Sequence, residues 1–527
     1  MNKKNKQINQ MVTGGLLLTA SSFVSKFLSA IYKVPFQNLT GDEGFYVYQQ
    51  VYPIYGLAVA FTMTGLPIFV SKVISEAPDD LSVKNRLHEL HTWLVLVGFF
   101  TFILLQFGAG PLAELMGDRE LAPVIQTVAY FFLFAPVLSL SRGFFQGQGN
   151  MLPTSLSQVI EQIVRVGILL WVAFYFGRST WSYYEMGVNA YHSAWLSAAV
   201  ASIALYVMLQ KSGQSQHFHS VLKPRFSLNM GKRLFTEGFL LVAFGSLMIF
   251  FQFIDSFTVY NGLVEAGFAE QAAMAMKGVY DRGQPMVQLG TVVGISFSMT
   301  SLPILRKQAV EEKWRAWAKE AGTIIKLTVL LSSAAAIGLV AVMPWMNKVL
   351  FTDQQGTAEL QMMMLSVGLV SFIYCIHTVS QSRSQRDPSL LFLIVGLGFK
   401  IMMNKLAVRI FGIMGSSIVT VMALLLIAIL FMQLIEKEVF QAVLKNHFLL
   451  KLITLLMALY ASVSGLLTLL SHFMGDVGRI DSFILTLVGV LIGVLIFGGG
   501  ALWLNVLSEQ EVDQLPLPEK VKTKIRK

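Results

Sequence analysis

The chain has little of what soluble and secreted proteins depend on. Of its 527 residues only 13% are charged, whereas an ordinary soluble domain carries about 25%. Cys375 is the only cysteine, which excludes an intrachain disulfide and a cage of thiolate metal ligands. With 54% hydrophobic residues, this composition excludes a soluble domain and indicates a chain that folds within a lipid bilayer.

Motifs for catalysis are also missing. The sequence contains no H-E-x-x-H, no paired cysteines at zinc spacing and no G-x-S-x-G. A phosphate-binding P-loop is absent as well, so ATP is not a direct energy source for this chain alone. We therefore expect a transporter and not an enzyme, with no metal site and no cofactor.

Long apolar runs separated by short polar breaks account for most of the chain. A helix needs about 20 apolar residues to cross a bilayer, and fourteen runs approach or exceed that length. They cover residues 10–37, 44–71, 88–109, 121–143, 153–176, 187–210, 233–260, 276–304, 319–343, 357–381, 389–411, 414–436, 450–471 and 482–506. The pattern predicts an all-α, multi-pass membrane protein of about 14 transmembrane helices.

The net charge of +10 is explained by the connections between these spans. With the predicted spans, 27 Lys and Arg residues fall on the side of the N-terminus and 6 on the other side. Cytoplasmic connections carry such an excess, so both termini are predicted to be cytoplasmic. We assign the charge to topology and to attraction by anionic lipids, and we expect no nucleic-acid partner.

An internal repeat is visible in the sequence. The string MTGLPI at Met63–Ile68 recurs as MTSLPI at Met299–Ile304, an offset of 299 − 63 = 236. Gln146 and Gln381 each precede a proline by seven residues, an offset of 381 − 146 = 235. Six spans separate the copies, so the two halves have the same orientation, as in transporters built from parallel repeats. The predicted parts are an N-terminal six-helix lobe (1–215), a C-terminal six-helix lobe (216–440), two appended transmembrane helices (441–508) and a basic cytoplasmic tail (509–527).

Charged side chains within the spans are the candidate functional residues, because an ionised group at bilayer depth costs about 2.5–3.5 kcal/mol. Glu161 and Arg165 lie four residues apart on one helix face, where they can pair. Such a pair either contributes to a polar cavity or only fixes helix packing. The offset of 235 takes Arg165 to Lys400 (165 + 235 = 400), so a cation recurs in both halves, as an anionic substrate would require.

Three further lysines lie within spans. Lys26 is near the middle of the first span and is a candidate for the cavity. Lys33 lies seven residues further on the same face, where it either faces the cavity or snorkels to the headgroups. Lys405 is about 140° around the helix from Lys400 at 100° per residue, so the two need not face one space.

The outer ends of three spans carry a second group of candidates. Asp255, Asp281 and Arg282 form a possible outer cluster, in which a carboxylate holds a coupling cation or neutralises Arg282. Tyr52 belongs to a tyrosine-rich stretch that indicates an interfacial belt or, alternatively, rings that stack on sugars. Pro53 allows a bend that would gate the outer mouth.

These residues resemble the polysaccharide-transport branch of the multidrug/oligosaccharidyl-lipid/polysaccharide (MOP) exporter superfamily, in particular proteins like stage V sporulation protein B and the related MurJ-type lipid II flippases. The resemblance rests on Ser22–Phe36, Gly41–Tyr48, Gly65-Leu66-Pro67, Ser71-Lys72 and Glu161-Gln162-x-x-Arg165.

The resemblance implies two six-helix lobes around a cationic cavity that opens alternately to either side. It implies movement of an undecaprenyl-diphosphate-linked saccharide, such as a cell-wall precursor, to the outer leaflet of a bacterial plasma membrane. Envelope-synthesis proteins are implied partners, and the membrane potential, Na+ or H+ are candidate sources of coupling. The first-span position of the essential MurJ arginines is Lys26 here, which keeps the charge without the guanidinium fork.

Two other functions remain open at this point. A cation-coupled multidrug exporter of the same superfamily would favour carboxylates in the N-terminal cavity, whereas cations prevail here. An integral-membrane glycosyltransferase or polymerase would usually need a substantial outer loop, and the predicted outer connections are short.

Overall fold

The computed structural model describes residues 21, 24–25, 27–214, 218, 224–238, 242–243, 245–383 and 388–506. Every secondary-structure element among these residues is helical, which confirms the all-α prediction. The chain divides into two compact units, Met1–Asp281 and Arg282–Lys527. This division follows Asp281 and not residue 215, so the lobe boundaries inferred from the repeat stay a prediction.

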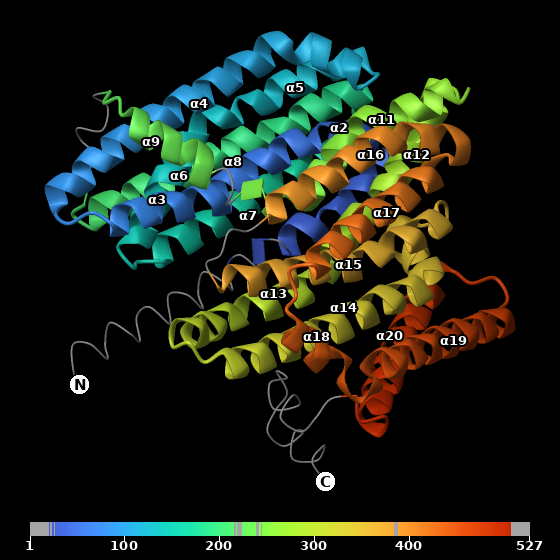
Figure 1. Ribbon diagram of the computed structural model, residues 1–527. Helices are drawn as coiled ribbons and strands as arrows, with labels where there is room; N and C mark the ends of the chain where they lie inside the picture. The colour runs from blue at the N-terminus through green and yellow to red at the C-terminus, as the bar shows by residue number, and fades with distance from the viewer. Residues whose placement is uncertain are drawn as a thin grey trace. The chain divides into compact units, whose positions relative to one another are not determined.

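Unit 1, residues 1–281, contains most of the predicted binding residues. Its helices are those coloured from blue to yellow-green in Figure 1. Its elements are α2 (Lys33–Ala60), the π-helix η1 (Phe61–Gly65), α3 (Leu66–Ser75), α4 (Asp80–Leu115), the 3-10 helix η2 (Arg119–Leu121), α5 (Ala122–Ala129), α6 (Phe131–Gly147), α7 (Leu152–Phe176), α8 (Tyr183–Lys211), α9 (Leu228–Arg233), the π-helix η4 (Leu234–Gly238), α11 (Leu247–Glu265) and α12 (Glu270–Asp281). Within it α7 packs along α8 and α3 along α6, while α2 contacts both α8 and α12.

Helix α2 changes direction at Gly41, whose φ of 74° and ψ of 177° are not helical. A positive φ carries little cost for glycine because it has no Cβ. The bend lies between the first and second predicted spans, 10–37 and 44–71, and it therefore separates them where the sequence indicates.

Unit 2, residues 282–527, is a second helical bundle. It comprises α13 (Gly283–Val310), α14 (Trp314–Phe351), α15 (Thr357–Gln381), α16 (Ser389–Phe411), α17 (Ile413–Met432), α18 (Lys437–Leu444), the 3-10 helix η5 (Lys445–His447), α19 (Phe448–Met474) and α20 (Arg479–Trp503). The last two long helices, α19 and α20, pack on each other and on α14.

Twelve helical segments of the described chain are long and apolar enough to cross a membrane. One of them, Phe27–Ser75, runs through the first two predicted spans, and α13, at the eighth predicted span, is not among the twelve. The structure thus shows a multi-pass membrane protein, while the count of fourteen stays a prediction.

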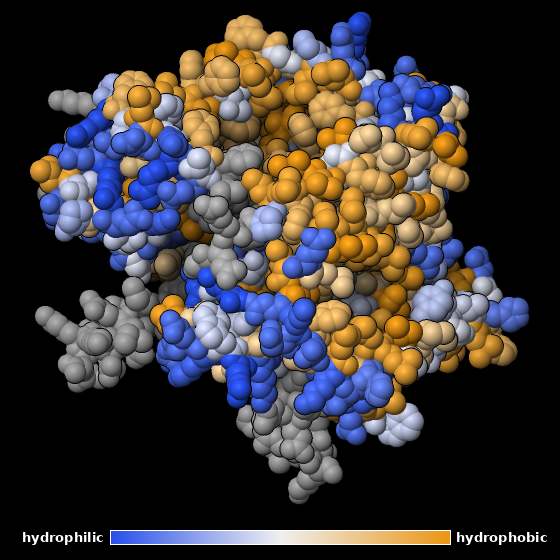
Figure 2. Space-filling view, in the orientation of Figure 1, coloured by the Kyte–Doolittle hydropathy of each residue, from blue (hydrophilic) through white to orange (hydrophobic). Residues whose placement is uncertain are grey.

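The surface has the distribution that a bilayer requires. Figure 2 shows a continuous hydrophobic area over α16 and α17 of unit 2, where Leu391, Ile394, Ile401 and Leu425 are exposed. In unit 1 hydrophilic side chains gather over α9 and the adjoining end of α4. Large exposed apolar side chains on long helices are typical of lipid contact.

Candidate functional site

One face of α2 forms an aromatic wall inside unit 1. Tyr48, Tyr52 and Tyr55 are spaced by four and three residues, so they project from the same side of the helix. All three are buried, Tyr52 being 8% exposed. The interpretation of this stretch as an interfacial belt is therefore wrong, while sugar stacking by these rings stays a prediction.

Arg165 projects from α7 into this wall. Its guanidinium donates to the hydroxyl of Tyr48 at 2.6 Å and to that of Tyr32 at 3.1 Å. The same guanidinium lies 4.0 Å from the ring centroid of Tyr55, and the side chain is fully buried. Phenol oxygens and ring faces thus supply the contacts that a buried cation needs.

Lys33 reaches the same group of rings from the first turn of α2. Its ammonium lies 3.8 Å from the ring centroid of Tyr52, and the residue is 1% exposed. Snorkelling to the headgroups is therefore excluded for this lysine in the structure. Arg165 and Lys33 lie close enough to act on one another electrostatically. We call Lys33, Arg165, Tyr32, Tyr48, Tyr52 and Tyr55 the cation cage.

The cage carries positive charge that is not neutralised by direct contact. Among the described residues, neither Lys33 nor Arg165 forms an ion pair with a carboxylate. Nearby, Tyr55 Oη and Gln162 Oε1 are buried polar atoms without a hydrogen-bond partner in the described part of the chain. Asp281 also acts on Lys33, without direct contact, but its charge is already paired with Lys277. Two buried cations whose direct contacts are neutral groups retain a positive potential, which attracts anions.

The i,i+4 spacing indicated that Glu161 can pair with Arg165, but Glu161 has a different partner in the structure. Its Oε2 accepts from Arg142 of α6 at 2.7 Å, and both side chains are completely buried. Arg142 is one of the 27 basic residues counted on the side of the N-terminus, because it lies at the end of the predicted span 121–143. The helix extends beyond it to Gly147, which places Arg142 within the protein. Tertiary packing thus replaced the local pairing rule.

The carboxylates near the predicted outer cluster have partners of their own. Asp281 accepts from Lys277 at 2.6 Å, and Asp255 accepts from the hydroxyl of Tyr280 at 3.0 Å. Arg282, the first residue of unit 2, pairs with Asp353 at 2.6 Å. Asp281 and Arg282 thus each have an oppositely charged partner, and a coupling cation at Asp255 stays a prediction.

The remaining predicted site residues lie outside the cation cage. In unit 2 Lys400 is completely buried and donates to Thr420 Oγ1 at 2.6 Å, whereas Lys405 is half-buried. Lys26 lies outside the described residues. Pro53 is buried within α2, which bends at Gly41. Of the predicted substrate-binding residues, Lys33 and Arg165 lie together in the structure. Tyr52, which was predicted in the outer group, lies with them.

The buried positions of Arg142 and Lys277 and the contact of Tyr32 with Arg165 were not predicted from the sequence. Tyrosines at positions 48, 52 and 55 share a helical face, and this spacing was the one available signal for the cage. No cluster of three or more His, Cys, Asp or Glu residues that could bind a metal occurs among the described residues. The cage is suited to binding and orienting an anion and contains no nucleophile paired with a base.

This geometry and the two helical bundles define a multi-pass membrane transporter. The family model "Polysaccharide biosynthesis protein" matches residues 11–309, more than half of the chain. The chain therefore belongs to that family, and with it to the polysaccharide-transport branch of the MOP exporter superfamily.

Relatives from Bacillus subtilis (strain 168) agree with this assignment. The uncharacterized membrane protein YabM is 31% identical over 523 residues, 98% of this chain and 96% of YabM. The lipid II flippase MurJ of the same organism is 24% identical over 437 residues, 78% of this chain and 80% of MurJ.

Solved structures show the same fold. An inward closed conformation of the lipid II flippase MurJ gives a TM-score of 0.68 at 12% identity, covering 92% of this chain and 98% of that one. An inward-facing MATE multidrug transporter of the MOP superfamily gives 0.64 at 16% identity, covering 78% and 93%. The protein is a transporter of the flippase and exporter type.

Proposed function

We propose that this protein moves an undecaprenyl-diphosphate-linked saccharide from the inner to the outer leaflet of a bacterial plasma membrane by alternating access. The observation that carries the proposal is the cation cage, in which Arg165 and Lys33 are buried against phenols and have no carboxylate partner among the described residues. A diphosphate supplies the negative charge that this site lacks. The relatives named as lipid II flippases support this substrate class.

In this mechanism the guanidinium of Arg165 exchanges phenol contacts for phosphate oxygens. A guanidinium binds phosphate through two parallel hydrogen bonds, which a phenol cannot match. Lys33 adds a second charge beside it, and Lys26, Lys400 and Lys405 are proposed to extend the positive surface. The sugars lie against the tyrosine rings and the polyprenyl chain stays in lipid.

The cage also favours this function over export of cationic drugs. A cationic drug would meet Arg165 and Lys33 as like charges, and like charges brought together at low dielectric repel strongly. We propose coupling to the membrane potential, Na+ or H+, both termini in the cytoplasm, and contacts with anionic lipids and envelope-synthesis proteins.

Reconstituted vesicles provide the test. A labelled undecaprenyl-diphosphate disaccharide should become accessible to an enzyme outside the vesicles, and Arg165→Gln should slow its appearance at least tenfold, since one charge-assisted contact contributes about 1.5–3 kcal/mol. Gly108→Ala is the control, because a Cβ at Gly108 meets open space. Runs with an imposed potential, a Na+ gradient or a pH gradient identify the coupling.

Two results would overturn the proposal. One is an equal rate for wild type and Arg165→Gln. The other is transport of a cationic dye with no transport of the lipid-linked disaccharide.

A further inference from the structure

The helix that carries the tyrosine wall contains a π-helical turn near its end. Helix α2 ends at Ala60, the π turn η1 covers Phe61–Gly65, and α3 begins at Leu66. In a π turn each N–H bonds to the carbonyl five residues earlier. Accordingly the N–H of Leu66 donates to the carbonyl of Phe61.

The π turn and Pro67 together leave two carbonyls without their usual helical donors. In an α-helix the N–H of Leu66 would serve the carbonyl of Thr62, but it is used by Phe61. The carbonyl of Met63 would receive its bond from residue 67, which is proline and has no N–H. A buried carbonyl without a donor is costly, so both need donors from elsewhere.

Side chains from two neighbouring helices supply these donors. Arg142 Nη1 of α6 donates to the Thr62 carbonyl at 3.2 Å, and Gln158 Nε2 of α7 donates to the Met63 carbonyl at 3.0 Å. Arg142 is held in turn by Glu161 at 2.7 Å and by Ser157 Oγ at 3.0 Å. All of these side chains are buried.

The second half of the internal repeat serves as a comparison within the molecule. Pro67 corresponds to Pro303 by the offset of 236, and α13 continues through Pro303 as one α-helix from Gly283 to Val310. By the offset of 235, Arg142 corresponds to His377 (142 + 235) and Gln158 to Leu393 (158 + 235). The π turn thus occurs in the half that has the two donors.

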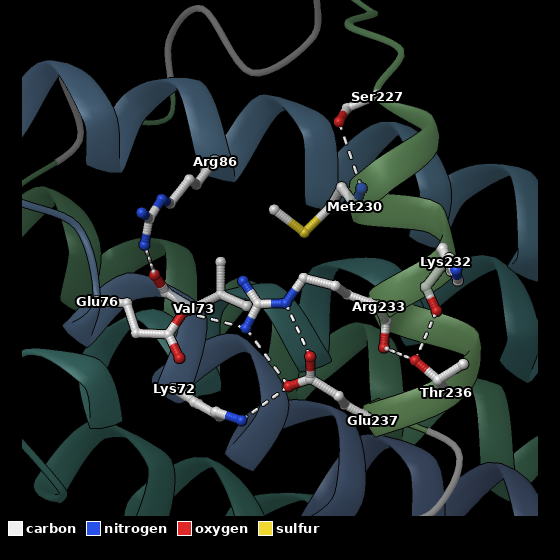
Figure 3. A network of polar contacts seen from close by, with 10 residues as sticks. All are labelled: Lys72, Val73, Glu76, Arg86, Ser227, Met230, Lys232, Arg233, Thr236 and Glu237. Atoms are coloured by element: carbon white, nitrogen blue, oxygen red, sulfur yellow. Dashed lines mark hydrogen bonds and ion pairs between the residues drawn. The ribbon is translucent and has the colours of Figure 1, made fainter.

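Beyond the turn, α3 is fastened on two sides. Gly143 of α6 packs so closely that a Cβ there would lie 2.4 Å from Val70 Cβ. Figure 3 shows ion pairs from the C-terminal end of α3 to α9 and η4, with Lys72 to Glu237 at 2.8 Å and Glu76, which follows α3, to Arg233 at 3.0 Å. The cation cage lies on the other side of the turn.

We propose that the π turn η1 is a hinge about which α2 tilts relative to α3, and that Arg142 and Gln158 are positioning residues that hold it in the π form. The link to substrate rests on the proposed function. Gln158, Glu161 and Arg165 are spaced by three and four residues on one face of α7. Through this face α7 contacts the tyrosines of α2 at Arg165 and the π turn at Gln158. When an anion separates Arg165 from the tyrosines, the contact at the π turn remains, and α2 tilts about it.

A double-mutant cycle between Gln158 and Pro67 tests the hinge. Gln158→Leu leaves the Met63 carbonyl without its donor and should change the ratio of hinge conformers about tenfold. Pro67→Ala provides a main-chain N–H for that carbonyl, so Gln158→Leu should have no further effect in the Pro67→Ala background. A merely structural role of Gln158 would not depend on residue 67.

The readout is the distance between two spin labels on either side of the turn. Glu43→Cys and Ile68→Cys, in a Cys375→Ser background, are separated by about 38 Å along a straight α-helix of 25 residues. Pulsed EPR in detergent measures their distance distribution. Gln162→Leu is the matched control, since Gln162 lies one turn further on α7 and no hydrogen bond joins it to the π turn among the described residues.

The expected result is a shifted distribution for Gln158→Leu alone, and no shift for Gln162→Leu. An equal shift in the Pro67 and Pro67→Ala backgrounds, an equal shift for Gln162→Leu, or no shift at all would overturn the hinge. Because this measurement uses no lipid-linked saccharide, its outcome is independent of the flipping assay, and either proposal can fail without the other.

Discussion

Among single residues, Arg165 shows how a cation is kept at depth in this protein. Its partners are two phenol hydroxyls and the face of a third tyrosine ring. Such neutral partners lower the cost of burial without cancelling the charge. Arg142, by contrast, has a carboxylate partner in Glu161. These two buried arginines are therefore different in kind, since of the two only Arg165 has no carboxylate partner among the described residues.

The contacts of Arg165 predict unequal effects for two conservative substitutions. Tyr48→Phe removes the oxygen that accepts from Arg165 at 2.6 Å, and it should lower the free energy of unfolding by about 1–3 kcal/mol. Tyr55→Phe keeps the ring beneath the guanidinium and removes a hydroxyl without a hydrogen-bond partner among the described residues. Tyr55→Phe should therefore lower the free energy of unfolding by less than Tyr48→Phe does. Thermal unfolding followed by circular dichroism compares them, and equal losses would contradict the assigned contacts.

For single residues, the sequence predicted burial where a charged residue lies deep within an apolar run. Arg165 and Lys400 were expected to be inside the protein because they lie within apolar runs, and they are buried; for Lys33 the sequence left snorkelling open, and this lysine is buried as well. The partner of Glu161 was missed because Arg142 is 19 residues away and belongs to another helix. Helical spacing describes neighbours on one helix, and it contains no information about how two helices face each other.

At the level of helices, polar side chains at the helix ends form hydrogen bonds with the backbone. Asp79 caps α4 by accepting from the N–H of Ser82 at 2.7 Å, and Ser182 forms a capping box with Glu185 at the start of α8. These caps satisfy the first N–H groups of each helix. The break between the first two spans was predictable because its region is less apolar. The π turn was not, since Met63–Ile68 differs from the α-helical stretch Met299–Ile304 only by Gly65 in place of Ser301.

The network of Figure 3 predicts a dependence of stability on pH. Glu237 lies outside the membrane-spanning helix that begins at Leu247, and its hydrogen bonds with Arg233 and Lys72 lower its pKa to about 2. Since this is below the ordinary value of 4.5, the ionised carboxylate stabilises the fold above about pH 4.5. That contribution is lost as the pH falls toward 2.

Glu237→Gln should therefore lower the unfolding midpoint at pH 7, and the difference from wild type should shrink between pH 4.5 and 3. The effect is small, about 0.2–1 kcal/mol, because the side chain is 34% exposed and solvent screens the pair. Glu76→Gln, which removes one contact to Arg233, should have a smaller effect. A difference that stays constant down to pH 3 would show that the carboxylate charge is not responsible.

For the whole molecule, hydropathy and charge together predicted most of the arrangement. The succession of long helices follows the apolar runs because each run must satisfy its backbone hydrogen bonds internally within lipid. Arg142 is one of the 27 basic residues counted on the side of the N-terminus, and Lys277 is one of the 6 on the other side. Both are buried, yet leaving both out of the count keeps a large excess of basic residues on the predicted cytoplasmic side. The division after Asp281 was not predictable, since it depends on how helices pack and not on where apolar runs end.

The orientation of the chain in the membrane can be tested at the two ends of α8. Thr180 and Ser212 lie just outside this helix and are both exposed. Each is replaced by cysteine in a Cys375→Ser background, and intact cells are treated with a maleimide that does not cross membranes. Position 180 should react in intact cells, and position 212 only after the membrane is opened, because the basic connections stay cytoplasmic. The reverse pattern would invert the topology, and the proposed direction of transport through the cation cage would then have to be inverted with it.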